Sequence, residues 1–291
     1  MKNRPKKQKQ GSNPLLLKAF FLALAIIALG TTLYFFKFTE KNPAVVYTAP
    51  VPSLPKATAS PPSPEDFDVH QKPALVKIAI IIDDIGNKKK LAEDIIALDL
   101  NLSYSILPQS PYAIYLAEKI TAAGRDMLLH LPLEPSDSKW NPGPGALMLS
   151  MSSKKLISTF NNDLTGFDFI GTNNHMGSKF TADPKAMHTL LSAVKSNGLF
   201  YVDSLTSAKS VGYTTAKELG IKTAKRDIFL DNEQTSQAIA SQFTKLIAIA
   251  KRRGSAIGIG HPYPATLEFL TAFRPTLLKE VKLVGIHELV E

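Results

Sequence analysis

The stretch Ile78–Gly86, which reads IAIIIDDIG, decides the fold of this chain. Its first five residues are apolar and four of them are isoleucine, a composition typical of a strand buried on both faces of a parallel sheet. The run ends at two carboxylates, Asp83 and Asp84, although burying an unpaired charge is costly. In parallel α/β folds the chemistry lies at the carboxyl ends of the strands. We therefore expect this strand to deliver an acid pair to an active-site rim, unless one aspartate only caps the following helix.

Short apolar runs and helical patterns alternate along the chain from Lys77 onward. The runs are interpreted as strands at residues 77–82, 102–106, 126–131, 168–172, 199–203, 221–224, 255–260 and 282–286. Helical periodicity occurs at residues 87–99, 111–123, 152–164 and 233–253, and between the Asp183-Pro184 cap and Gly198. This alternation predicts an α/β fold with a parallel sheet. Its length of about 215 residues favours a closed or distorted (β/α) barrel of seven or eight parallel strands over a doubly wound sheet.

The first 73 residues have a different composition. Residues 1–14 form a basic tail, and residues 15–38 hold an apolar run that approaches the roughly 20 residues needed to cross a bilayer. Since positive charge stays on the cytoplasmic side, we expect a single-pass anchor in the cytoplasmic membrane, with the domain on the extracytoplasmic side. The small-x-small triplet Ala28-Leu29-Gly30 leaves a cleaved signal peptide as the rival interpretation. Residues 39–73 are rich in proline and predict an extended linker before a domain at 74–291.

The positive charge of the chain is unevenly distributed. The formal net charge is +9, and six basic residues precede residue 19 without an acid among them. The predicted domain is therefore nearly neutral, which argues against nucleic acid as a partner. The chain has no cysteine, which excludes disulfides, thiolate ligands and a thiol nucleophile.

Polar residues recur where the predicted strands end. The set is Asp83, Asp84, His130, His175, Asp203 and His261. A barrel would bring these strand ends together at one pocket. An aspartate with two neutral imidazoles can hold Zn²⁺ or a similar divalent ion while leaving positions open for water and substrate. A second carboxylate can then act as a base and a further histidine as an acid, so the set predicts metal-assisted hydrolysis.

Five blocks of the sequence resemble the carbohydrate esterase/polysaccharide deacetylase superfamily and, within it, the divergent polysaccharide deacetylase family known mainly from bacterial envelopes. The blocks are Asp83-Asp84-Ile85-Gly86, His130-x-Pro132-x-Glu134-Pro135, Asn174-His175-Met176-Gly177-Ser178, Asp203-Ser204 and Gly260-His261-Pro262. The resemblance covers residues 77–287. It implies a distorted (β/α) barrel that removes N-acetyl groups from a polysaccharide with a divalent metal ion. It also implies that Asp83 is the base, Asp84 a metal ligand and His261 the general acid.

The second block departs from the main family, where two metal-binding histidines stand four residues apart. The corresponding pair here is His130 and Glu134, so the third ligand is either Glu134 or His175. We favour His175, because a second imidazole suits Zn²⁺. The arginine-proline block of the family's third motif is absent.

Four further residues are candidates for supporting roles. Asp203 either supports His261 or caps the turn at Ser204. Trp140, on a long loop above the rim, either stacks on a sugar ring or pins the loop. Ser178 and Ser204 are expected to contact substrate.

Two other function classes compete with an anchored deacetylase acting on an N-acetylated envelope glycan. The first is a catalytically inactive barrel that binds glycan or an envelope protein partner, which the altered second block favours. The second is a metal phosphoesterase, which would require more ligands and a more basic pocket.

Overall fold

The computed structural model describes residues 75–291, with residues 276–278 described by backbone alone. These residues form one sheet in which every ladder is parallel. The strands are β1 (Lys77–Ile85), β2 (Ser103–Ile106), β3 (Met127–Leu133), β4 (Gly171–Met176), β5 (Phe200–Asp203), β6 (Thr223–Lys225), β7 (Ile228–Phe229), β8 (Ser255–Gly260) and β9 (Lys282–Leu283). Their order is β6-β5-β4-β3-β2-β1-β8-β7, and β9 pairs with β1.

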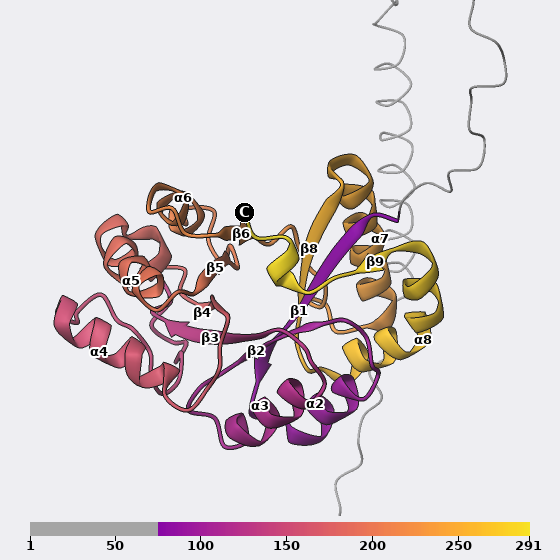
Figure 1. Ribbon diagram of the computed structural model, residues 1–291, viewed down its shortest axis with the longest axis horizontal. Helices are drawn as coiled ribbons and strands as arrows, with labels where there is room; N and C mark the ends of the chain where they lie inside the picture. The colour runs from indigo at the N-terminus through magenta and orange to yellow at the C-terminus, as the bar shows by residue number, and fades with distance from the viewer. Residues whose placement is uncertain (1–74) are drawn as a thin grey trace, which may run out of the picture. The chain divides into compact units, whose positions relative to one another are not determined.

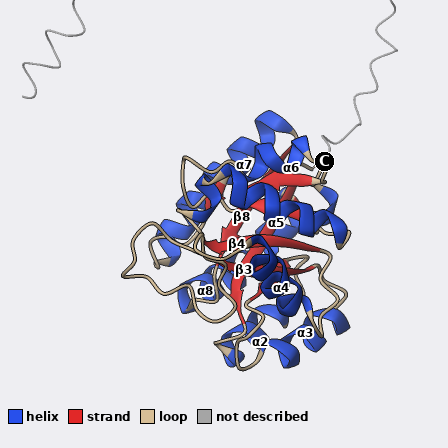
Figure 2. Ribbon diagram, turned by 90° about the vertical axis from the view of Figure 1, so that its left-hand side faces the viewer, coloured by secondary structure: helices blue, strands red, loops and turns tan. Residues whose placement is uncertain are grey.

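Helices cover the outer face of the curled sheet (Figures 1 and 2). They are α2 (Lys89–Ile96), α3 (Ala113–Ala122), α4 (Ser153–Leu164), α5 (Pro184–Ser196), α6 (Gly212–Glu218), α7 (Ser236–Arg253) and α8 (Pro264–Glu280), with short 3-10 turns η2 (Phe180–Ala182) and η3 (Ile286–Glu288). The Asp183-Pro184 start signal is confirmed, since the Asp183 side chain accepts a hydrogen bond from the Ala186 amide. Helix α7 ends at Gly254 in the left-handed conformation, after three basic residues.

The central strand β1 is buried on both faces, as its sequence predicts. Ile78, Ile80 and Ile82 pack into the large core beneath the helices. Ala79 and Ile81 point the other way, into a second apolar cluster inside the curl. Residues from the end of the chain complete that inner cluster, namely Val284 and Ile286 with the half-buried Leu289 and Val290. The inner cluster therefore fills the space enclosed by the sheet.

The predicted α/β class with parallel strands and outer helices is confirmed, and the barrel is incomplete. Within residues 75–291 no ladder joins β6 to β7, so the sheet stays open at that seam. Strand β7, a two-residue element, was not among the predicted strands. The predicted strand at 282–286 shortens to β9 and then turns into η3.

The predicted anchor at 15–38 and linker at 39–73 lie outside the described residues. Among residues 75–291, none of the helices combines the length and the apolar character that a membrane crossing demands.

Candidate metal centre and active site

The two aspartates of β1 occupy an irregularity at the end of the strand. The pairing register with β2 shifts between Ile82 and Ile85, and Asp84 has a left-handed backbone with φ of 56°. Successive side chains of a regular strand point to opposite faces, whereas a bulge can redirect one of them. Both carboxylates consequently approach the same imidazole nitrogen, Nε2 of His130, at 3.7 Å from Asp83 and 3.2 Å from Asp84.

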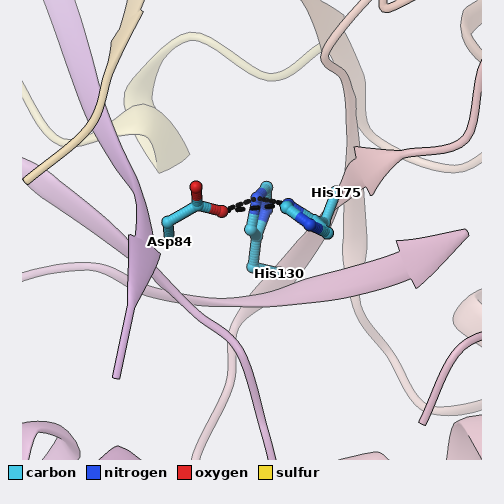
Figure 3. A group of neighbouring side chains, drawn as sticks. All are labelled: Asp84, His130 and His175. Carbon is cyan, nitrogen blue, oxygen red and sulfur yellow. Dashed lines mark hydrogen bonds and ion pairs between the residues drawn. The ribbon is translucent and has the colours of Figure 1, made fainter. Parts of the chain in front are cut away.

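The side chains of Asp84, His130 and His175 converge on one point (Figure 3). His130 lies in β3 and His175 in the neighbouring β4, so the parallel ladder brings the two rings together. Oδ1 of Asp84 lies 2.9 Å from Nδ1 of His175, and that nitrogen lies 3.1 Å from Nε2 of His130. The structure thus brings together the three residues that the sequence analysis favours as metal ligands.

These three atoms suit a divalent cation. Nδ1 of His130 lies 2.9 Å from Oδ1 of Asn173, an amide oxygen that can only accept a hydrogen bond. Nδ1 therefore carries the proton, and Nε2 turns its lone pair towards Oδ1 of Asp84. This oxygen is buried and receives no hydrogen bond from the part of the chain that the structure describes. Ligand atoms about 2.0–2.1 Å from a tetrahedral Zn²⁺ lie about 3.3 Å from one another, close to the spacing found here. Metal binding would offset the repulsion between these lone pairs.

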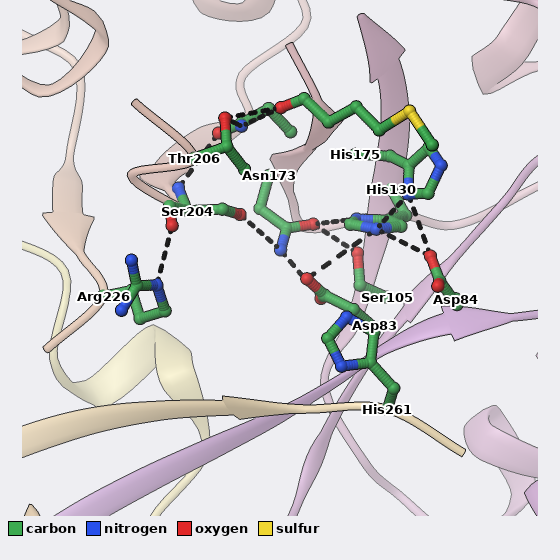
Figure 4. A network of polar contacts seen from close by, with 12 residues as sticks. Asp83, Asp84, Ser105, His130, Asn173, His175, Ser204, Thr206, Arg226 and His261 are labelled. Atoms are coloured by element: carbon green, nitrogen blue, oxygen red, sulfur yellow. Dashed lines mark hydrogen bonds and ion pairs between the residues drawn. The ribbon is translucent and has the colours of Figure 1, made fainter. Parts of the chain in front are cut away.

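Asn173, in β4, connects the metal ligands to the second aspartate (Figure 4). It is 1% exposed, and its amide nitrogen donates to Oδ1 of Asp83 at 2.8 Å and to the Ser204 hydroxyl at 3.2 Å. Its amide oxygen accepts from the Ser105 hydroxyl as well as from His130. Asn173 is not among the residues predicted from the sequence, although it lies two positions before His175 on the same strand and so faces the same side.

The two carboxylates differ in their electrostatics. Burial raises the pKa of Asp83 above its ordinary value, despite the opposing charges of His130 and His261 and the Asn173 hydrogen bond. Burial also acts to raise the pKa of Asp84, but the close imidazoles of His130 and His175 outweigh it and hold that pKa well below its usual range. Burial acts to lower the pKa of His130, but the charges of Asp83 and Asp84 outweigh it, so the pKa is raised above its ordinary value. Asp83 is thus the more basic of the two carboxylates.

His261 follows β8 and is held by an aspartate that the sequence analysis did not select. Its Nδ1 lies 2.8 Å from Oδ1 of Asp231, whose other oxygen accepts from the His261 amide and from the Thr266 hydroxyl. Burial acts to lower the pKa of His261, but the bond to Asp231 outweighs it and raises the pKa to about 9. His261 is therefore a cation near neutral pH, with its charge acting on Asp83.

The expected support of His261 by Asp203 is wrong. Asp203 directs its carboxylate into the loop that follows β5, where it accepts from the Leu205 amide, the Ser210 hydroxyl and the Tyr213 amide. It therefore has the other role that the sequence left open, that of a turn cap.

Glu134 is turned away from the metal ligands. One carboxylate oxygen accepts from the Leu149 amide and the other is paired with Lys179. Because one oxygen is occupied by the loop that follows β3 and the other by the loop that follows β4, the alternative in which Glu134 is the third ligand loses its geometric basis.

The three residues expected to bind substrate lie in different surroundings. Ser204 is 1% exposed beneath the site, where its amide donates to Asn174 and its hydroxyl accepts from Asn173. Ser178 accepts from the Ser136 amide and thereby ties two loops together. Trp140 is 65% exposed, next to loop residues that line the cavity described below.

A cavity of about 350 Å³ opens beside the cluster. Asp84 and His175 belong to its lining. Neutral residues line the rest, namely Asn87, Leu107, Gln109, Ser110, Pro111, Pro132, Asn141, Pro142, Gly143 and Pro144. Amide and hydroxyl groups between flat proline faces suit a neutral polar ligand such as a sugar.

Comparisons with known proteins agree with this architecture. The family model described as divergent polysaccharide deacetylase matches residues 80–290. An uncharacterized protein of Haemophilus influenzae is 39% identical over 216 residues, which cover 73% of this chain and 76% of that protein. The Escherichia coli protein YibQ is 34% identical over 215 residues, which cover 74% of this chain and 67% of that protein.

The fold also has a counterpart among solved structures. The crystal structure of an uncharacterized protein from Agrobacterium tumefaciens superposes with a TM-score of 0.71 at 24% identity, covering 76% of this chain and 91% of that one. The family model matches residues 80–290, which is most of the chain, and this match establishes the family of the protein. This protein belongs to the divergent polysaccharide deacetylase family.

Proposed function

We propose that the protein is a metal-dependent deacetylase that removes N-acetyl groups from an envelope glycan. The observation that carries the proposal is the convergence of Asp84, His130 and His175 beside a buried carboxylate, Asp83, and a cationic imidazole, His261. Membership of a deacetylase family supplies the reaction class, the hydrolysis of an amide bond.

Asp84, His130 and His175 would hold one divalent ion, and two imidazoles with one carboxylate favour Zn²⁺. When bound, such an ion polarises a carbonyl group and makes water more acidic. Asn173 holds His130 in the tautomer that directs Nε2 towards the ion.

Asp83 and His261 then divide the proton transfers. Asp83 takes a proton from the attacking water, for which its raised pKa suits it. The water oxygen adds to the acetyl carbon, and His261 gives its proton to the sugar nitrogen as the carbon–nitrogen bond breaks. The products are acetate and a sugar with a free amine. Asp231 keeps His261 protonated and oriented for the second transfer.

We further propose that the domain acts outside the cytoplasm, attached to the bacterial inner membrane. The support is the apolar run at residues 15–38, which is preceded by five basic residues and has a sixth, Lys18, near its start. Residues 39–73 are then long enough to let the domain reach a glycan away from the bilayer.

The test is acetate release from N-acetylated chitooligosaccharides and from peptidoglycan by the purified zinc-loaded protein. We expect Asp83→Asn to retain zinc and to lose about 10²–10⁴-fold in rate, the usual contribution of a general base. The matched control is Asp168→Asn, an exposed aspartate before β4 at the opposite end of the strands. Zinc binding without acetate release from either substrate would favour the inactive glycan-binding barrel.

A further inference from the structure

A buried aspartate outside the proposed catalytic machinery holds an exposed glutamine in place. Asp163, in the last turn of α4, is 1% exposed, and its Oδ1 accepts from Nε2 of Gln109 at 2.7 Å. Its Oδ2 is buried and has no hydrogen-bond partner among residues 75–291. Gln109 itself is exposed, in the loop that follows β2.

This arrangement is unfavourable for folding in two ways. A buried carboxylate with one unpaired oxygen loses its hydration, and its negative charge lies near the negative end of the α4 dipole. Burial raises the pKa of Asp163 to about 6. A fold gains little from fixing an exposed glutamine at this cost, so a role for the fixed amide is the simpler explanation.

The backbone of a third segment is shaped around the same pair. Gly145 has φ of 78°, and a Cβ atom on it would lie 2.6 Å from Oδ1 of Asp163 and 2.9 Å from Nε2 of Gln109. The absence of a side chain at Gly145 lets the long loop after β3 close over the pair. Gln109 is therefore positioned from both sides.

Gln109 lies between two cavities. It lines the 350 Å³ cavity beside the metal centre, and it also lines a second cavity of about 510 Å³ over α4. The other residues of this second cavity, which we call the α4 cavity, are Gly145, Ala146, Met151, Lys155, Ser158, Thr159 and Asn162. Both volumes fall in the range of about 300–1,000 Å³ that is typical of small-molecule sites.

We propose that the α4 cavity is a second saccharide subsite, which binds the sugar adjacent to the one that is deacetylated. Gln109 is the specificity-determining residue between the subsites, where its fixed amide contacts both sugars. This inference rests on the proposed function and defines its substrate as a chain of at least two linked sugars. Hydroxyl, amide and ammonium groups of the α4 cavity match the hydroxyl-rich surface of a sugar. Among them, the buried Thr159 hydroxyl oxygen has no hydrogen-bond partner within the described residues.

The test compares the binding of N-acetylglucosamine with that of its β-1,4-linked tetramer by titration calorimetry on the full-length protein. We expect the wild-type protein to bind the tetramer at least tenfold more tightly than the monosaccharide. Ser158→Phe, which places a ring in the α4 cavity, should reduce this ratio to about one. Gln109→Leu, which removes the amide but keeps the bulk, should weaken tetramer binding about tenfold.

Ser196→Phe is the matched control. Ser158 and Ser196 are both exposed helical serines whose hydroxyls donate to a carbonyl of their own helix, and Ser196 lies on α5 away from both cavities. The control should keep the wild-type ratio, and a cooperative thermal transition in each variant verifies folding. Equal affinities of the wild-type protein for both saccharides, or an unchanged ratio in Ser158→Phe, would overturn the subsite alone. Failure of the wild-type protein to bind either saccharide would overturn it together with the proposed function.

Discussion

The amide oxygen of Asn173 lies 2.9 Å from Nδ1 of His130, and the same amide donates to Asp83 at 2.8 Å. One buried side chain thus sets the tautomer of a proposed metal ligand and orients the proposed base. Hydrogen-bonding partners of this kind are worth about 10–100-fold in metal affinity.

We therefore expect Asn173→Leu, which keeps the volume and removes both hydrogen bonds, to weaken zinc binding by about 10–100-fold. Competition titration with a chromogenic chelator measures the affinity. The control is Asn161→Leu on the exposed face of α4, which should bind zinc like the wild-type protein. Wild-type affinity in Asn173→Leu would contradict the assigned role.

The identity of the third ligand is open to direct measurement. Since His175 faces Asp84 while Glu134 is bonded to Leu149 and Lys179, His175→Ala should lose far more zinc than Glu134→Ala. Elemental analysis of both purified proteins gives the zinc content, with His188→Ala as the control for an exposed histidine. Zinc retained in His175→Ala but lost in Glu134→Ala would transfer the ligand role to Glu134. Retention in both, and in Asp84→Ala, would exclude the metal site.

The pairing of His261 with Asp231 predicts the alkaline limit of activity. The pKa of His261 is raised to about 9 from an ordinary value of about 6.5. Its proton is therefore available below pH 9, and kcat/KM should fall as the pH rises through about 9. In Asp231→Asn the raising interaction is lost, so the fall should begin at lower pH.

The control for this experiment is Asp126→Asn. Asp126 pairs with His287 at 2.8 Å, but it lies just before β3, at the opposite end of the strands from the site. The pH profile of Asp126→Asn should match the wild-type profile, and an alkaline limit that stays in place in Asp231→Asn would refute His261 as the acid.

The free energy of unfolding that the His261–Asp231 pair contributes should depend on pH in the same direction as the activity. It is fully present below about pH 6.5 and is lost as the pH rises through about 9.

The proposed topology can be tested with reporter fusions after residue 60. Because positive charge is concentrated before the apolar run at 15–38, an alkaline phosphatase fusion should be active and a cytoplasmic reporter fused at the same residue should be inactive. The reverse pattern would place the domain in the cytoplasm and remove an envelope glycan from the candidate substrates.

The sequence predicted those parts of the fold and site that depend on strand periodicity. The apolar run before Asp83 identified β1, and the polar residues at strand ends identified His130, His175 and His261. These predictions succeed because a parallel sheet places the carboxyl ends of its strands along one edge. No alignment is needed for that inference, since the period of a strand and the direction of the sheet suffice.

The partner of His261 could not be predicted in the same way. Asp231 follows β7, a two-residue strand without an apolar run, and only the pairing of Phe229 with Ile259 of β8 brings that aspartate beside His261. Asp203, in contrast, ends a strand with a clear apolar pattern, so it was the aspartate considered as the support of His261. Glu134 was equally ambiguous, because its partners Leu149 and Lys179 lie on distant loops that spacing cannot locate.

The left-handed backbone of Asp84 has a consequence for how this protein can evolve. The backbone of Asp84 has a φ of 56°. Glycine adopts this left-handed conformation without steric cost, and asparagine tolerates it well. A single substitution to either residue would remove the carboxylate while leaving β1 undisturbed or even relaxed. Under the proposed function, loss of this metal ligand would leave the fold intact, so one substitution could convert an enzyme into a binding protein with the same fold. An aspartate kept at this position is therefore a marker by which catalytic and non-catalytic descendants of the same fold can be sorted.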